Sequence, residues 1–397
     1  MINKVSTSKV FFMFLAFVVL FLPSALMMPA QASQISIVTS IGIDSSTEGI
    51  ELSTTILVPK FESGFAKNTE VVSVNSENIA EGLHTMSVNL GKQIGLAHLS
   101  VIAISDEVFT TKNTAKLLKP LLLNEQANKN AVVISTNKSA KQLLQLSSTE
   151  DANSSNSLIS MLELSENDLF KNKGSLQNFF INYNKPTSSS MLGIINAVEE
   201  SVQGEDTQET NSENETDQPK KTLLSDGSIA IIKNGIKQTT LTKKQKQDLY
   251  WFTNKISGTT FTVKNVDDDV YNNKDVVLTV ANSKIKPRTS FYNSIPRLNL
   301  NLKIQVSIEN FSHNYALNNN QRLLTTELQR RIKLYIKQAM SRSFNYIKST
   351  NTDIHNFYEL FKAFNNQKFK AYLNLKNLDN YLDKLELFVS ISLNSKN

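Results

Sequence analysis

The sequence has no cysteine in its 397 residues, and it has only four histidines and one tryptophan. The absence of cysteine excludes disulfides, thiol catalysis, iron–sulfur clusters and zinc sites built on thiolates. The histidines have no helical i, i+4 spacing and lie in no recognisable carboxylate motif: they are His84, His98, His313 and His355. We interpret His98, inside LAHLSV, as an ordinary strand residue. The 12 glycines are scattered, so no phosphate-binding loop is predicted.

Two further patterns suggest chemistry but are better explained without it. Asp267–Asp269 lacks the ligand spacing of a calcium loop, which favours a solvated turn. Ser135–Lys138 fits the S-x-x-K pattern, but the companion S-D-N and K-T-G motifs are absent, and there is no G-x-S-x-G elbow. We therefore expect a protein that binds or holds a partner, with no catalytic residue, no cofactor and no metal.

The N-terminus has the pattern of an export signal. Lys4 and Lys9 precede an apolar run from Val10 to Met28, and Ala30-Gln31-Ala32 is an A-x-A site, so cleavage after Ala32 is expected. The run is about 19 residues long, close to the minimum that spans a bilayer, so an uncleaved membrane anchor stays open as the alternative. Either outcome places the remaining chain outside the cytoplasmic membrane.

A β-hairpin is predicted directly after this signal. Ile35, Ile37, Thr39, Ile41 and Ile43 alternate with other residues, which is typical of a strand with one buried face. The polar run 44–49 reverses the chain. A second strand begins at Glu51 and is ended by Pro59. Apolar strands and amphipathic helices then alternate to about residue 150, which predicts a mixed α/β domain.

The second half of the chain opens with a change in composition. Residues 203–221 contain no aliphatic side chain and many acidic ones, which predicts a flexible, solvated loop. Strands and a helix capped by Thr242 then indicate a small α+β unit. Residues 297–308, RLNLNLKIQVSI, alternate so regularly that they predict a long strand with one wet face. A long helix over 321–348, a second helix capped by Asp353 and a last strand over 385–393 follow.

Positive charge is concentrated near the C-terminus. Residues 284–397 contain 18 basic and seven acidic residues. Many of the basic residues fall on the long helix, and we select Arg330, Arg331, Lys333 and Lys337 as a candidate contact face. An exported protein meets no intracellular nucleic acid, so the anionic partner would be lipid headgroups or an acidic face of another subunit. A solvated helix face is the alternative.

Several segments resemble the Ger(x)C family, the C subunits of GerA-type spore germinant receptors. IVTSIGID over Ile37–Asp44 and ELSTTILVP over Glu51–Pro59 are similar to the family's first hairpin, and AHLSVIAIS over Ala97–Ser105 is similar to its next strand. A looser similarity covers residues 232–256 and everything from Arg297 onward, including Thr352–Phe357. The family normally begins with an acylated cysteine, which this chain lacks.

The resemblance implies an α+β fold of three mixed α/β domains, each a mostly antiparallel or mixed sheet with packed helices, in an elongated chain. It implies a non-enzymatic subunit of a nutrient germinant receptor, beside an A-type and a permease-like B-type subunit, on the outer face of the spore inner membrane. Without the cysteine, attachment would depend on an uncleaved N-terminus or on partners. A secreted or cell-envelope binding protein from the same family is the alternative, and a secreted hydrolase is a distant third.

We therefore expect five segments. Residues 1–32 form the signal peptide or anchor, 33–200 an N-terminal mixed α/β domain, 201–221 a disordered acidic loop, 222–290 a small middle α+β domain, and 291–397 a C-terminal α+β domain with a long basic helix.

Overall fold

A computed structural model describes residues 34–58, 69–150, 154–165, 174–199, 221–254, 256–309, 324–378 and 380–395. The predicted export signal with its cleavage site at Ala32, His313, and residues 201–220 of the predicted acidic loop lie outside these ranges. The first elements are β1 (Ile35–Ser46), β2 (Gly49–Leu57), β3 (Thr69–Ser76), α2 (Ile79–Leu90), β4 (Gln93–Gly95), β5 (Val101–Ser105), α3 (Asp106–Thr111), α4 (Thr114–Leu123), β6 (Val132–Thr136), α5 (Ala140–Glu150), α6 (Ser154–Ser165) and α7 (Leu176–Tyr183).

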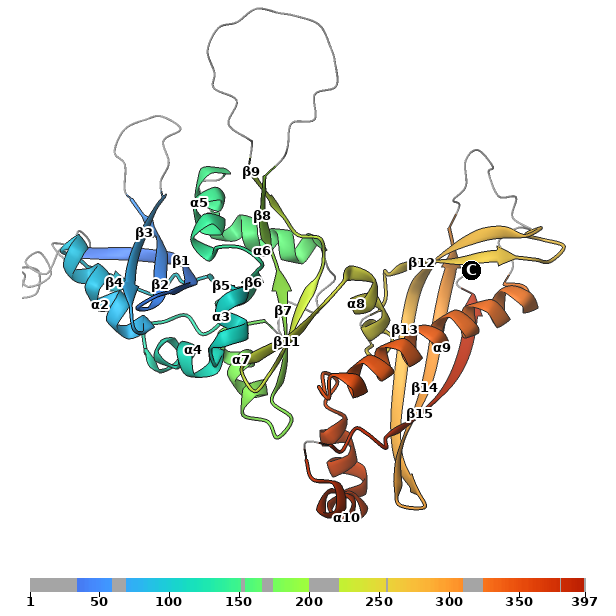
Figure 1. The fold of residues 1–397 in the computed structure, drawn as a ribbon. Coiled ribbons are helices and arrows are strands. Elements are labelled where there is room, and N and C mark those ends of the chain that lie inside the picture. The colour runs from blue at the N-terminus through green and yellow to red at the C-terminus, as the bar shows by residue number, and fades with distance from the viewer. Residues whose placement is uncertain are drawn as a thin grey trace, which may run out of the picture.

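The remaining elements are β7 (Ser189–Ile194), β8 (Asn196–Glu199), β9 (Lys221–Leu224), β10 (Ile229–Lys233), β11 (Ile236–Leu241), α8 (Lys243–Tyr250), β12 (Thr260–Val266), β13 (Lys274–Tyr292), β14 (Ile295–Ile308), α9 (Thr326–Ser349), α10 (Phe357–Lys376) and β15 (Glu386–Ser395). They form two main sheets that lie along an elongated molecule (Figure 1). The α+β class expected from the sequence is confirmed.

Residues 35–241 build a nine-stranded mixed sheet, with β8 and β9 as a separate two-stranded ribbon. Its strand order is β11-β10-β7-β6-β5-β1-β2-β3, and β4 pairs with β1 beside this path. The neighbours β1, β5, β6 and β7 are parallel, whereas β1–β2 and β10–β11 are antiparallel hairpins. Parallel neighbours need long crossover connections, and α3 to α7 lie in the connections from β5 to β6 and from β6 to β7.

β1 lies inside this sheet and is buried on both faces. A β-bulge between Val38 and Ser40 adds one residue and thereby reverses the alternation. Val38 is consequently buried in place of Ile37, and Ile35 is 42% exposed. The expected single buried face from Ile35 to Ile43 is therefore wrong: Ser36 and Val38 are buried before the bulge, and residues 40–44 are buried on both faces after it.

Helix α5 rests on β1 at Gly42 and Asp44. A Cβ atom on Gly42 would lie 3.1 Å from Leu144 Cδ1 and 3.2 Å from the carbonyl carbon of Ala140, so any larger residue would push the helix away. The buried Asp44 carboxylate accepts hydrogen bonds from the Ala140 N–H (2.7 Å), the Lys141 N–H (2.9 Å) and the Ser139 hydroxyl (2.9 Å). It thus satisfies N–H groups that have no partner inside the helix.

The C-terminal sheet has the order β12-β13-β14-β15, in which β15 is parallel to β14 and the other pairs are antiparallel. The alternation predicted for residues 297–308 is confirmed, because Leu298, Leu300, Leu302, Ile304, Val306 and Ile308 are all buried. They share one core with the apolar sides of α9 and α10. The N-cap position of α10 is Asn356 and not the expected Asp353, but the Asp353 carboxylate accepts from the first N–H groups of the helix, those of Phe357 (2.8 Å) and Tyr358 (3.0 Å).

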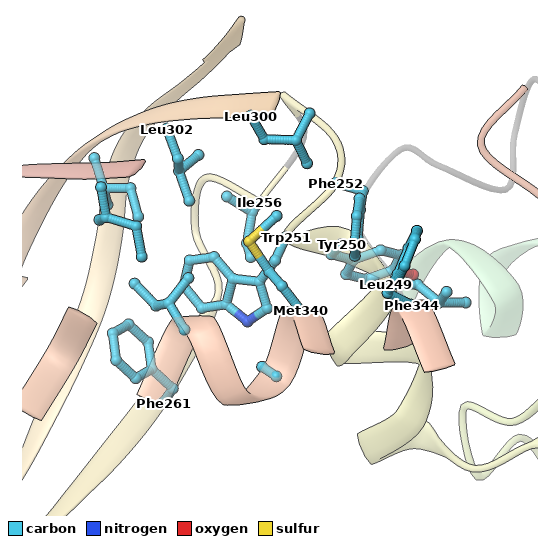
Figure 2. Close-up of a cluster of buried hydrophobic side chains, with 14 of the residues drawn as sticks. Leu249, Tyr250, Trp251, Phe252, Ile256, Phe261, Leu300, Leu302, Met340 and Phe344 are labelled. Carbon is cyan, nitrogen blue, oxygen red and sulfur yellow. The ribbon is translucent and has the colours of Figure 1, made fainter. Parts of the chain in front are cut away.

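The strands expected in a middle domain at residues 222–290 are divided between the two sheets. β10 and β11 extend the large sheet, whereas β12 and β13 belong to the C-terminal one. Between them, α8 and the following turn bury Leu249, Trp251 and Ile256 against α9 and β14 (Figure 2). Ile229, Ile231 and Leu241 of the large sheet join this same buried cluster. The two sheets are therefore connected through a continuous apolar core.

Candidate functional site

The predicted contact residues all lie on α9. This helix begins at the cap Thr325, whose hydroxyl accepts a hydrogen bond from the Leu328 N–H. Leu328, Ile332, Ile336, Ala339, Ser343 and Ile347 recur at helical spacing and are buried, which fixes the opposite side of the helix toward solvent. The basic residues fall on or beside that solvent side.

The structure separates these four basic residues into two pairs. Arg330 and Arg331 both bind Glu327, each with an Nε to carboxylate distance of 2.7 Å, and the Arg330 side chain stays 62% exposed. Hydrogen bonds from Arg330 and then Arg331 lower the pKa of Glu327 to about 2. Lys333 and Lys337 have no ion-pair partner among the described residues. The outer side of α9 therefore keeps a net positive charge, most of it free at the two lysines.

Two other basic residues of α9 serve internal contacts that the sequence did not reveal. Arg342 donates to both carboxylate oxygens of Asp248 on α8, from Nε at 2.9 Å and from Nη2 at 3.2 Å. Lys348 donates to the Leu385 carbonyl oxygen at 3.3 Å. Since Asp248 is buried and lies 94 residues before Arg342, its partner could not be identified from local spacing.

A pocket of about 320 Å³ lies between α8 and α9. Asp248 and Arg342 form part of its wall together with the apolar Leu241 and Leu249. The buried hydroxyl of Ser343 also lines it and has no hydrogen-bond partner among the described residues. The pocket has room for a small molecule with a polar group. The charges of Asp248 and Arg342 neutralise each other, and Lys244, which also lines the pocket, leaves its wall with one positive charge.

Lys246, on α8, gives a testable dependence of stability on pH. Its side chain is buried beneath the loop before β10, where its ammonium donates to the Gly227 carbonyl oxygen. Burial lowers the pKa of Lys246 to about 7. Between about pH 7 and its ordinary pKa the unfolded chain then binds more protons than the folded chain, so the free energy of unfolding should rise with pH.

We expect a slope of at most about 1.4 kcal/mol per pH unit from this lysine. Urea denaturation at several pH values above 7 would measure it. Lys246→Met should remove the slope, because methionine fills similar space without a titrating group. An unchanged slope in the variant would contradict the assignment to Lys246.

The described residues contain no group of three or more histidine or carboxylate residues that could hold a metal ion. Within those residues, no helix is long and apolar enough to cross a bilayer. Asp268, the middle residue of Asp267–Asp269, accepts hydrogen bonds from the N–H groups of Val270 and Tyr271 and from the Thr325 hydroxyl. Its contacts are those of a turn that also fixes the start of α9.

These features define an α+β protein of two joined sheets whose helix α9 presents free positive charge. The family model described as the spore germination protein N-terminal domain matches residues 30–197. The model described as spore germination B3/GerAC-like, C-terminal, matches residues 227–394. The chain therefore belongs to the GerAC-like spore germination protein family.

The fold agrees with this membership. The chain is similar to the crystal structure of the GerBC protein, with a TM-score of 0.55 and 12% sequence identity. The similarity covers 90% of this chain and 97% of that one. No curated protein matches the chain by sequence.

Proposed function

We propose that this chain is a non-enzymatic C-type subunit of a nutrient germinant receptor and helps to trigger spore germination. The observation that supports this most is that both family models, for the N-terminal and the C-terminal domain, match consecutive parts of the chain. Its partners in this proposal are an A-type and a permease-like B-type subunit. Its location is the outer face of the spore's cytoplasmic membrane, held there by its N-terminus or by those partners.

A genetic and biochemical experiment tests the proposal. Spores lacking the chain should fail to respond to the nutrients that wild-type spores recognise, and should still respond to a trigger that bypasses nutrient receptors. An affinity-tagged chain should copurify with A-type and B-type subunits from the spore membrane fraction. Recovery of the chain only from the culture medium would instead support a secreted relative that joins no receptor.

We further propose the outer side of α9 as a contact surface for an acidic face of a partner subunit. Lys333→Glu/Lys337→Glu should weaken copurification about tenfold or more, because reversing unpaired charges at a contact introduces repulsion. Lys362→Glu/Lys368→Glu, at two exposed positions of α10, is a control with the same change of net charge. Arg330→Glu/Arg331→Glu should have a similar effect, with some loss of helix stability since Glu327 would lose its partners. Equal copurification of all variants would exclude α9 as the contact.

A further inference from the structure

The C-terminal sheet has a second face that the described helices leave open. On the inner face, the buried leucines and isoleucines of β14 pack in one core with α9 and α10. On the outer face, the intervening residues of β13, β14 and β15 are exposed or half-buried. This face lies on the opposite side of the sheet from the basic side of α9, so the two surfaces can be occupied at the same time.

The outer face is basic along its centre. Lys284, Lys286 and Arg288 alternate along β13, and all three are exposed. The register places Lys303 of β14 directly opposite Lys284. None of these four side chains has a hydrogen-bond or ion-pair partner in the part of the chain that the structure describes.

Acidic residues are scarce around these cations. No Asp or Glu occurs from residue 281 to residue 305, and asparagines stand opposite Lys286 and Arg288. On β15 the single acidic residue is Glu386, which is bound to Arg297 at 2.7 Å. Like charges directly opposite each other destabilise a sheet, so the Lys284–Lys303 pair is unfavourable for folding by itself. An anionic partner would remove that repulsion.

Exposed aromatic rings lie on the same face, toward the hairpin that joins β13 to β14. Tyr292 is 57% exposed, and Phe388, whose register partner is Asn299, is 46% exposed. The Arg297 guanidinium carbon lies 4.3 Å from the centre of the Tyr292 ring and 5.1 Å from that of Phe388. Aromatic rings beside arginine and lysine are the composition of surfaces that rest in the headgroup region of a membrane.

We propose that the outer face of β13, β14 and β15 binds the surface of an anionic lipid bilayer. Lysine and arginine would contact the phosphates, and Tyr292 and Phe388 would enter the headgroup layer. The aromatic pair favours lipid over an acidic protein face as the occupant. The inference rests on the proposed function only in placing the chain at a membrane.

Vesicle binding by the full chain tests this. Co-sedimentation is compared for phosphatidylcholine vesicles and for vesicles of equal parts phosphatidylcholine and phosphatidylglycerol, at low and high salt. Lys286→Gln/Arg288→Gln should weaken binding to the anionic vesicles about 30-fold, because each cation contributes roughly fivefold to the affinity. High salt should weaken the binding of the wild-type chain to these vesicles, because it screens the charges. The N-terminal segment, with its apolar run and with Lys4 and Lys9, is the same in the wild type and in every variant, so its contribution cancels when these proteins are compared on one vesicle type.

Lys333→Gln/Lys337→Gln on α9 removes the same charge from the other side of the sheet and should leave vesicle binding unchanged. Lys284→Glu should weaken vesicle binding and yet raise the Tm, because it exchanges a like-charge pair for an opposite one across the strands. This combination excludes unfolding as the reason for lost binding.

Two results would overturn the inference: no preference of the wild-type chain for anionic vesicles, or equal losses in the β13 and α9 variants. An acidic protein partner would then be the better occupant of this face. Because the vesicles contain no other protein, these results are independent of whether the chain copurifies with receptor subunits.

Discussion

Asp44→Ala should lower the free energy of unfolding by about 3 kcal/mol, as measured by urea denaturation. The buried carboxylate accepts three hydrogen bonds at the start of α5, from the N–H groups of Ala140 and Lys141 and from the Ser139 hydroxyl. Alanine would leave the buried Ala140 N–H and the partly buried Lys141 N–H without an acceptor. Asp44→Asn should lose less, since its amide oxygen can still accept from one of them.

Glu51→Ala is the matched control for this prediction. Glu51 lies opposite Asp44 in the register of β1 and β2, and it binds the Lys141 ammonium at 2.5 Å. Both of these side chains are about one-third exposed, so their ion pair should contribute less than about 1 kcal/mol. If Asp44→Ala and Glu51→Ala cost the same, the cap is not what holds α5 on the sheet.

This result would show what the stretch IVTSIGID does in the fold. Gly42 admits α5 to within van der Waals distance of β1, and Asp44 holds the first turn of that helix. Both residues therefore act on a segment nearly 100 positions further along the chain. The sequence predicts the two strands and their turn, but it does not show which later segment Gly42 and Asp44 contact.

Elsewhere in the chain, too, the correct predictions concern local patterns and the missed features concern contacts between distant segments. The alternation of residues 297–308 is a local property, and it identified both the buried and the wet face of β14 before any partner was known. By contrast, the burial of β1 on both faces depends on a bulge and on parallel pairing with β5. The division of β10 to β13 between two sheets depends on long-range pairing in the same way.

The candidate contact residues illustrate the limit for side chains. Helical periodicity places Arg330, Arg331, Lys333 and Lys337 toward solvent, and the structure leaves Arg330 and Lys337 exposed but Arg331 and Lys333 half-buried. Whether each charge is free depends on its neighbours. Glu327 lies three residues before Arg330 and four before Arg331, so local spacing indicates these ion pairs. Local spacing does not indicate that Asp248 pairs with Arg342. For the outer face of the sheet, the sequence predicts only that one side of β14 is polar. The cluster of positive charges on this face depends on the register of β13 against β14.

Trp251→Ala should lower the free energy of unfolding by about 4 kcal/mol, because the cavity left by an indole in a packed core cannot be filled by small shifts. Trp251 is 2% exposed and lies between α8, α9 and the C-terminal sheet (Figure 2). Its ring meets Phe261 edge to face, with 5.5 Å between ring centres. Trp251→Phe should recover much of the loss. Circular dichroism during urea denaturation would compare all three proteins.

The position of Trp251 predicts where the loss is felt. Its cluster includes Ile229 and Ile231 of β10 as well as Leu302 of β14, so it joins the large sheet to the C-terminal one. In Trp251→Ala, amide hydrogen exchange should therefore accelerate in both β10 and β14. Acceleration confined to β14 would show that the two sheets open independently, and that a partner bound at the C-terminal sheet could not act on the N-terminal one through this core.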